Sequence, residues 1–142
     1  MSELALASIV RNFGSIIDEA VETGVLGPGI QKITHDKTDK LYYRICEIPA
    51  GSIGSTYVHK FAHVSVCLSG TVVLVNQDGE KRTVHGGEVF ITPAGTQRAL
   101  VALTDVKFMT VHAVDEINLE CPEETLGYKT MDEYTRYITQ EH

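Results

Sequence analysis

The feature that most limits the possible folds is a series of short segments with strand-like patterning, separated by residues that form turns. Beyond His35, runs rich in valine, isoleucine and threonine alternate with tight breaks such as Asp78-Gly79, a strong hairpin signal. Predicted strands are Leu41–Ile48, Ser55–Cys67, Thr71–Asn76, Lys81–His85, Glu88–Thr92, Gln97–Leu103 and Val106–Val114. Because short connections favour antiparallel pairing, the pattern predicts a mainly β chain folded as a sandwich or barrel.

Helical patterns flank the predicted strands. Apolar residues recur at helical spacing from Ser2 to about Glu22. Near the other end, Thr130 and Glu133 have the spacing of a capping box that begins a short helix. A chain of 142 residues is most simply one domain. We therefore expect a single domain with a helical arm over residues 1–30, a β-barrel over 35–115 and a helical tail over 116–142.

The charge of the chain argues against general nucleic-acid binding. The formal net charge is −7, and lysines and arginines are scattered instead of clustered. The first residues lack a basic signal region, and no apolar run approaches the roughly 20 residues that cross a bilayer. The 3 cysteines show no C-x-x-C spacing, so no disulfide framework is expected. These observations predict a cytoplasmic protein without a membrane or general nucleic-acid partner.

Three histidines raise the question of a metal site. His59 and His63 stand four residues apart before a valine-rich run, and His112 lies on the last predicted strand. Zinc, iron and manganese sites use three or four neutral or anionic donors, so these imidazoles could form a set. Whether His112 faces inward depends on the loop at Thr104-Asp105: a two-residue loop pairs position 98 with 111, and a three-residue loop pairs it with 112. The sequence leaves both registers open.

The spacing of glycines, histidines and a proline resembles the two motifs of the cupin superfamily. The matching positions are Gly51, Tyr57, His59, His63 and Gly70 for the first motif, and Gly87, Pro93, Gly95, Arg98 and Ala102 for the second. The resemblance implies a cupin-like antiparallel β-barrel, or double-stranded β-helix, with metal ligands at positions 57, 59, 63 and 98. Here only His59 matches in kind, whereas the glycines and proline that the turns need are kept.

Arg98 changes the chemistry expected at its position. A guanidinium stays protonated in proteins, so it cannot donate to a metal and would repel one. The same group suits a phosphate or carboxylate through charge-assisted hydrogen bonds. Tyr57, His59, His63 and His112 are the further candidate ligand-binding residues. Lys60 is also a candidate, although strand alternation turns it toward the outside or a neighbouring subunit.

These residues predict binding of a small anionic, nucleotide-like molecule without turnover and without a cofactor. Affinity should then increase as the pH falls through about 6.5, where imidazole gains charge. The alternative is a metal-dependent cupin enzyme, such as a dioxygenase, isomerase or lyase. There His59, His63 and His112 would hold zinc, iron or manganese, with Tyr57 as acid or base. A homo-oligomer is expected, because cupins commonly pair through their sheets and the N-terminal helix offers an apolar face.

A second resemblance involves the strings HKFAH, PAGTQR and TDVKFMTVH. In this order they are similar to small proteins encoded by tailed bacteriophages, over about residues 50–115. The similarity implies action in the cytoplasm of an infected bacterium, as an inhibitor that sequesters nucleotide signals of host defence. A phage structural or assembly protein that uses the barrel as a scaffold is a third hypothesis.

Overall fold

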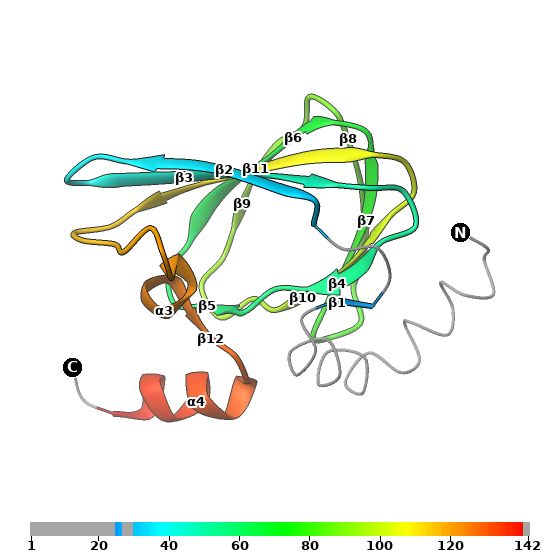
Figure 1. Cartoon of the computed structure of the whole chain (residues 1–142). Coiled ribbons are helices and arrows are strands. Elements are labelled where there is room, and N and C mark those ends of the chain that lie inside the picture. The colour runs from blue at the N-terminus through cyan, green and yellow to red at the C-terminus, as the bar shows by residue number, and fades with distance from the viewer. Residues whose placement is uncertain (1–24, 27–29, 141–142) are drawn as a thin grey trace.

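Two five-stranded antiparallel sheets face each other in the computed structural model, which describes residues 30–140 and the backbone of Val25–Leu26 (Figure 1). In spatial order, sheet A contains β1 (Val25–Leu26), β4 (Ile53–Ser55), β10 (Arg98–Ala102), β7 (Thr71–Asn76) and β8 (Lys81–His85). Sheet B contains β2 (Lys32–Lys37), β3 (Leu41–Ile48), β11 (Val106–Ala113), β6 (His63–Ser69) and β9 (Val89–Thr92). This arrangement confirms the predicted mainly β, antiparallel fold.

Neighbours within a sheet are mostly distant in sequence. Among the described strands, β2–β3 and β7–β8 are the hairpins between consecutive elements, and the second turns at Asp78-Gly79 as predicted. Other connections cross between the sheets. At the crossing from β6 to β7, Gly70 has a φ of 88°, and a Cβ there would collide with the carbonyl oxygen of Asp105. A glycine is required at this crossing because of both the positive φ and the close approach.

Most of the predicted strands are confirmed. β3, β7 and β8 have the predicted bounds, and β9, β10 and β11 are shorter than predicted by one or two residues. The single strand predicted over Ser55–Cys67 is wrong: β4 ends at Ser55, and β5 (Val58–His59) and β6 follow. The chain leaves sheet A there, and β5 pairs with β12 (Gly127–Tyr128) before β6 enters sheet B.

Both ends of the chain add elements to the predicted set. α4 (Met131–Thr139) begins as predicted, because the Thr130 hydroxyl accepts a hydrogen bond of 3.2 Å from the backbone N–H of Glu133. α3 (Pro122–Leu126) lies within the predicted helical tail but was not predicted as a separate helix, and β2 starts at Lys32, before the expected start of the barrel at residue 35. The predicted helix from Ser2 to Glu22 lies outside the described residues.

The register expected at Thr104-Asp105 is also wrong. β10 and β11 lie in different sheets, so position 98 pairs with neither 111 nor 112. Arg98 instead lies opposite Asn76 on β7, and His112 lies opposite Tyr42 on β3. A short loop can either close a hairpin or connect two facing sheets. The spacing of residues in the sequence does not distinguish these two possibilities.

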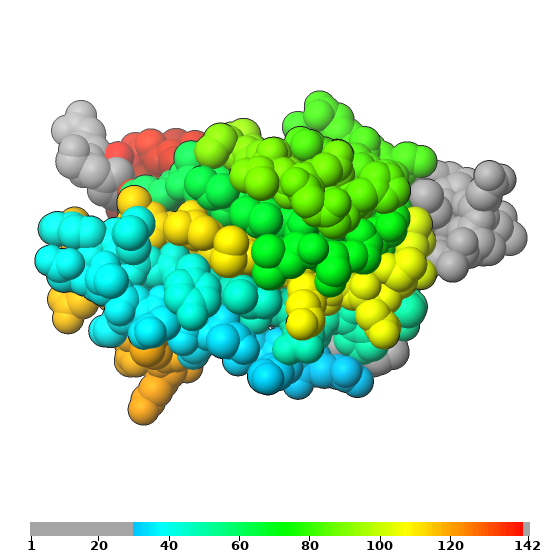
Figure 2. Space-filling model, turned by 90° about the horizontal axis from the view of Figure 1, so that it is seen from above, coloured from blue at the N-terminus to red at the C-terminus, as the bar shows by residue number. Residues whose placement is uncertain are grey.

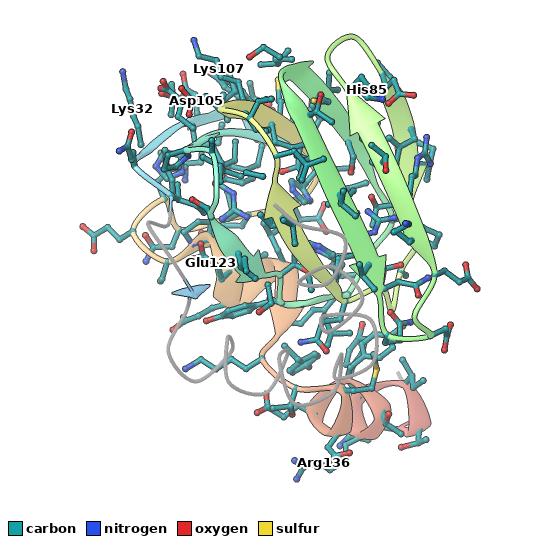
Figure 3. All side chains as sticks on the ribbon, turned by 90° about the vertical axis from the view of Figure 1, so that its right-hand side faces the viewer. Lys32, His85, Asp105, Lys107, Glu123 and Arg136 are labelled. Carbon is teal, nitrogen blue, oxygen red and sulfur yellow. The ribbon has the colours of Figure 1, made fainter. Side chains whose placement is uncertain are left out.

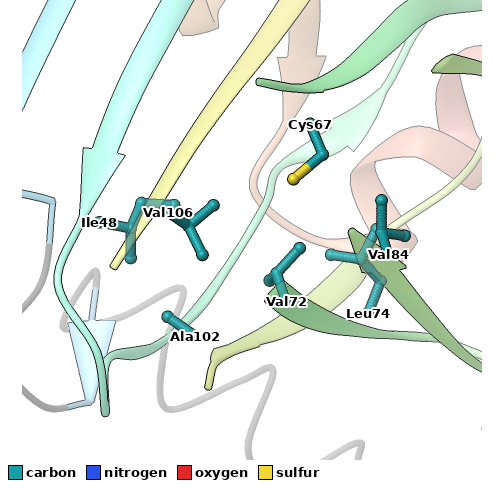
Figure 4. Close-up of a cluster of buried hydrophobic side chains, with 7 residues drawn as sticks. All are labelled: Ile48, Cys67, Val72, Leu74, Val84, Ala102 and Val106. Carbon is teal, nitrogen blue, oxygen red and sulfur yellow. The ribbon is translucent and has the colours of Figure 1, made fainter. Parts of the chain in front are cut away.

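An apolar cluster joins the sheets on their inner faces (Figure 4). Its buried members are Ile48, Cys67, Val72, Leu74, Val84, Ala102 and Val106. Burial of an aliphatic side chain contributes about 1.5–3 kcal/mol, so this cluster is a main source of stability. A second cluster contains Tyr42, Val114, Ile117 and Leu126, and it fixes α3 below β3 and β11 (Figure 1).

The outer face of sheet B is strongly apolar. Two rows of paired residues cross β3, β11, β6 and β9: Ile45, Met109, Val66 and Val89, and then Tyr43, Val111, Val64 and Ile91. Val89 and Ile91 are each 62% exposed. In Figure 2, which looks onto this side, β3 in cyan, β11 in yellow and β6 in green lie side by side. We call these eight residues the outer apolar face.

No helix in the described ranges is long and apolar enough to span a membrane.

Candidate functional site

A cavity of about 210 Å³ lies between the two sheets. Its walls are mostly apolar and share Ile48, Val72 and Leu74 with the central cluster. Its ionisable groups are Arg44, Cys46, Tyr57, His59, His63, Arg98 and Glu123, and the hydroxyls of Ser55, Thr56, Ser65 and Thr110 also line it. A mostly apolar cavity with a few polar groups is the usual form of a small-molecule site.

Strand alternation explains why these polar groups point inward. Side chains on a strand alternate between its two faces, so Tyr42, Arg44 and Cys46 on β3 share one face. The register places Arg44 opposite Thr110 on β11, and Thr110 opposite Ser65 on β6. A polar row therefore crosses the inner face of sheet B next to the apolar cluster.

Arg98 enters the cavity from sheet A and is held by hydroxyl groups. Its Nη1 donates a hydrogen bond of 2.8 Å to Oγ1 of Thr92, which also shares a hydrogen bond of 2.6 Å with the hydroxyl of Ser65. Thr92 and Ser65 are each 1% exposed. The guanidinium carbon lies 5.4 Å from the centre of the Phe90 ring. These contacts orient the guanidinium inside the fold.

Among the described residues, no carboxylate pairs with Arg98. Within the described part of the chain, the ion pairs are Lys40–Asp115 and Arg44–Glu123. Burial lowers the pKa of Arg98, and the nearby charge of Arg82 lowers it further. An arginine still keeps its proton in a protein, so Arg98 is a partly buried positive charge without a negative partner.

Arg44 is the second cation of the cavity, and it is paired. Its Nη1 lies 2.7 Å from Oε1 of Glu123 on α3, and the two side chains are 21% and 36% exposed. Neither residue was predicted from the sequence. Arg44 could have been noticed as a charge on the inward face of a predicted strand. Glu123 gave no such signal, because the sequence does not show where the tail packs.

Three imidazoles gather beside the cavity. The ring centres of His59 and His63 are 4.3 Å apart, and those of His63 and His112 are 4.5 Å apart. His112 is 5% exposed, so it faces inward, and its Nε2 is hydrogen-bonded to the Thr110 hydroxyl at 2.8 Å. The structure thus answers the question that the sequence left open. His112 lies behind His63 and does not itself line the cavity.

Burial keeps these imidazoles uncharged. It is the main reason why the pKa falls to about 2 for His59, about 3 for His112 and about 4 for His63. The positive charge of Arg44 lowers all three pKa values further. The imidazoles are therefore neutral near pH 6.5. These pKa values argue against the expected gain of affinity through histidine protonation near pH 6.5, because the sequence does not report desolvation.

The arrangement of these side chains does not fit the metal that cupin motifs imply. In residues 30–140, no three histidine, cysteine, aspartate or glutamate side chains are placed to hold a metal ion. The rings of His63 and His112 are stacked with an interplanar angle of 30° instead of converging on one point. Arg44 and Arg98 add positive charge nearby. The Nδ1 of His63 is buried, and a hydrogen bond with the backbone of Phe61 partly offsets the lowering of the pKa of this imidazole by burial.

The other two predicted site residues, Tyr57 and Lys60, differ in whether they line the cavity. Tyr57 lines the cavity, as predicted from the motif spacing. Lys60 does not: its Nζ lies 4.7 Å from the centre of the Tyr128 ring and donates to the carbonyl of Glu124. Lys60 therefore lies in the bend after β5 and points away from the cavity.

Comparison with known proteins supports one fold. Residues 44–113 match the family described as Cupin domain. A structure from Neisseria meningitidis aligns with a TM-score of 0.53 and 10% identity, over 61% of this chain and 87% of that one. The chain has a cupin fold.

Two further solved structures align with this chain at higher identity. The polyketide cyclase RemF from Streptomyces resistomycificus is 25% identical, with a TM-score of 0.51 over 63% of this chain and 69% of RemF. KdgF from a Halomonas species is also 25% identical, with a TM-score of 0.52 over 62% of this chain and 81% of KdgF. No curated protein sequence matches the chain. The cupin resemblance is thus confirmed at the level of the fold, and no comparison supports the similarity to phage proteins.

Proposed function

We propose that the chain binds a compact organic anion whose negative group pairs with Arg98. The observation that carries this proposal is a partly buried guanidinium that has no carboxylate partner in residues 30–140, inside a mostly apolar cavity. A buried charge without a partner is costly, and a bound anion would compensate it. Carboxylates and phosphates match the fork of a guanidinium through paired hydrogen bonds.

The hydrogen bonds of Arg98 leave room for such a pairing. Thr92 accepts from Nη1, and a guanidinium has five N–H groups. Among the described residues, no other side chain accepts from this guanidinium. The contact with Thr92 and the nearby Phe90 ring hold the group in one orientation, which lowers the entropy lost when a ligand binds.

The cavity favours a small ligand with an apolar body. Its volume of about 210 Å³ lies below the roughly 300–1,000 Å³ typical of sites for drug-sized molecules. A carboxylate on a short aliphatic or aromatic body fits this volume better than a nucleotide-like molecule. A nucleotide-like ligand therefore remains a less favoured hypothesis. The same holds for the role as a phage inhibitor of host defence and for a purely structural role in a phage.

The neutral imidazoles favour binding over turnover. General bases work best with a pKa near the working pH, whereas His59 and His63 have pKa values of about 2 and 4. They can still form hydrogen bonds to a polar group of the ligand. Tyr57 lines the same cavity and can contribute a hydroxyl in the same way.

Isothermal titration calorimetry with hexanoate, benzoate, inorganic phosphate and adenosine monophosphate tests the proposal. We expect hexanoate or benzoate to bind the wild-type chain, and Arg98→Gln to weaken this binding by about 10- to 100-fold, as for loss of a charged hydrogen bond. Arg82→Gln is the control, because Arg82 lies 4.0 Å from the centre of the same Phe90 ring but does not line the cavity. Equal affinity in Arg98→Gln and the wild type would exclude this site.

The second candidate is a cupin enzyme. The clustered imidazoles and the similarity to a polyketide cyclase favour it. Elemental analysis of the purified protein discriminates the metal-dependent form. About one zinc, iron or manganese per chain, lost in His63→Ala, would support it over the binding function.

A further inference from the structure

The charges of the side chains that line the cavity do not sum to zero. They are Arg44, Arg98 and Glu123, which together carry one net positive charge. The other ionisable lining groups with shifted pKa values are uncharged at neutral pH, because burial lowers the pKa of His59 and His63 and raises that of Cys46. The cavity therefore presents a single uncompensated charge, at Arg98.

Glu123 is held in place by the packing of α3. Leu126, at the end of this helix, is 6% exposed and packs with Tyr42, Val114 and Ile117. The next residues form β12, which pairs with β5, and the carbonyl of Leu126 accepts a hydrogen bond of 2.9 Å from the backbone of Lys60. Figure 3 labels Glu123, whose carboxylate is paired with Arg44 and lines the cavity. The carboxylate is thus a built part of the cavity wall.

We propose that Glu123 makes the cavity selective for monoanions, an inference that rests on the proposed function. Glu123 neutralises Arg44, so one negative charge on the ligand balances the site at Arg98. A second negative charge would enter a mostly apolar space without a free cation and would face the carboxylate of Glu123. Uncompensated charges are costly in such surroundings.

The ligand class follows from this charge balance. Monocarboxylates and phosphate diesters carry one charge at neutral pH and satisfy the site. Dicarboxylates carry two, and phosphate monoesters carry about −1.5 to −2 at pH 7. The latter two groups should be rejected, although both contain chemistry that an arginine binds well.

Hexanoate and adipate form a matched pair of probes, because adipate adds a second carboxylate to the same number of carbons. Calorimetry at neutral pH should show that the wild-type chain binds hexanoate at least about tenfold more tightly than adipate. In Glu123→Gln, the affinity ratio of adipate to hexanoate should rise by about tenfold, since Arg44 is then free to pair with the second carboxylate. The preference of the wild-type chain for hexanoate is measured without any variant, so it can be tested even if Glu123→Gln folds poorly.

Two further variants control the experiment. Glu124→Gln removes the same charge from the adjacent, exposed residue of α3, and it should leave the ratio unchanged. Arg44→Gln combined with Glu123→Gln restores one net positive charge, so the preference for hexanoate should return. If hexanoate binds through Arg98 but adipate binds equally well, or Glu123→Gln leaves the ratio within about twofold, the monoanion selectivity alone is wrong. If no variant or wild-type chain binds hexanoate, the proposed function fails, and this inference fails with it.

Discussion

Arg98 and Thr92 are joined inside the fold by a hydrogen bond of 2.8 Å from Nη1 to Oγ1. Thr92 belongs to β9 of sheet B, whereas Arg98 belongs to β10 of sheet A. The bond therefore spans the space between the two sheets. It makes Arg98 part of the interior wall of the cavity and gives the guanidinium one direction.

Replacement of this hydroxyl is expected to weaken both binding and stability. Thr92→Val keeps the shape of the side chain but leaves Nη1 of Arg98 and the hydroxyl of Ser65 without their partner. We expect the free energy of unfolding to fall by about 1–3 kcal/mol, the cost of an unmade buried hydrogen bond, and hexanoate affinity to fall by about tenfold. Urea denaturation and calorimetry measure these two effects.

Ser52→Ala is the matched control for Thr92→Val. Its hydroxyl is buried and has no hydrogen-bond partner among the described residues. Loss of such a group should leave stability equal or slightly higher, and should not change hexanoate affinity. A Thr92→Val protein as stable as Ser52→Ala would show that the bond between the sheets contributes nothing.

The affinity for hexanoate is expected to stay constant from about pH 6 to pH 8. His59 and His63, with pKa values of about 2 and 4, do not gain a proton in this range. Calorimetry across the range checks this expectation. A marked rise in affinity as the pH falls from 8 to 6 would mean that an imidazole is protonated beside the ligand, contrary to the structure.

Stability is expected to fall as the pH decreases below about 6.5. The folded chain lowers the pKa of His59, His63 and His112, so the unfolded chain binds protons first and unfolding becomes easier as protons are added. The loss begins near the unfolded pKa of about 6.5 and continues to about pH 4 for His63, about pH 3 for His112 and about pH 2 for His59. Each histidine contributes at most about 1.4 kcal/mol per pH unit in this window.

Urea denaturation at several pH values measures this slope. His112→Gln should make the slope less steep, because one buried imidazole is removed. His85→Gln is the control: His85 is exposed on β8, and its replacement should leave the slope unchanged. Equal slopes in all three proteins would contradict the buried, neutral state of His112.

Self-association through the outer apolar face is the expected origin of a homo-oligomer. Its exposed Val89 and Ile91 lie on an edge strand of sheet B, and large exposed apolar patches mark interaction sites. Size-exclusion chromatography with light scattering should show a dimer or larger species, and Ile91→Glu should shift it toward the monomer. Thr83→Glu, on an exposed position of β8, is the control. A wild-type chain that remains monomeric at high concentration would contradict the expectation.

The sequence predicted local features of the fold well and tertiary ones less well. Alternation gave the bounds of β3 and β7, and motif spacing placed Tyr57, His59, His63 and Arg98 around one cavity. It did not reveal that the loop at Thr104-Asp105 crosses between sheets, since turn residues serve hairpins and crossings alike.

The ion pair between Arg44 and Glu123 could not be predicted from the sequence for a similar reason. Arg44 and Glu123 are 79 residues apart in sequence, and their contact depends on where α3 packs. The pKa values of the histidines likewise depend on burial by surrounding strands. Local sequence patterns indicate neither the packing of α3 nor the burial of the histidines.

The most direct test of the account is the binding of hexanoate to the wild-type chain and to Arg98→Gln under identical conditions. The wild type should bind, and the variant should keep its fold by circular dichroism while losing about 10- to 100-fold in affinity. A correctly folded Arg98→Gln that binds hexanoate as tightly as the wild type would contradict the role of this guanidinium as the anion-binding group.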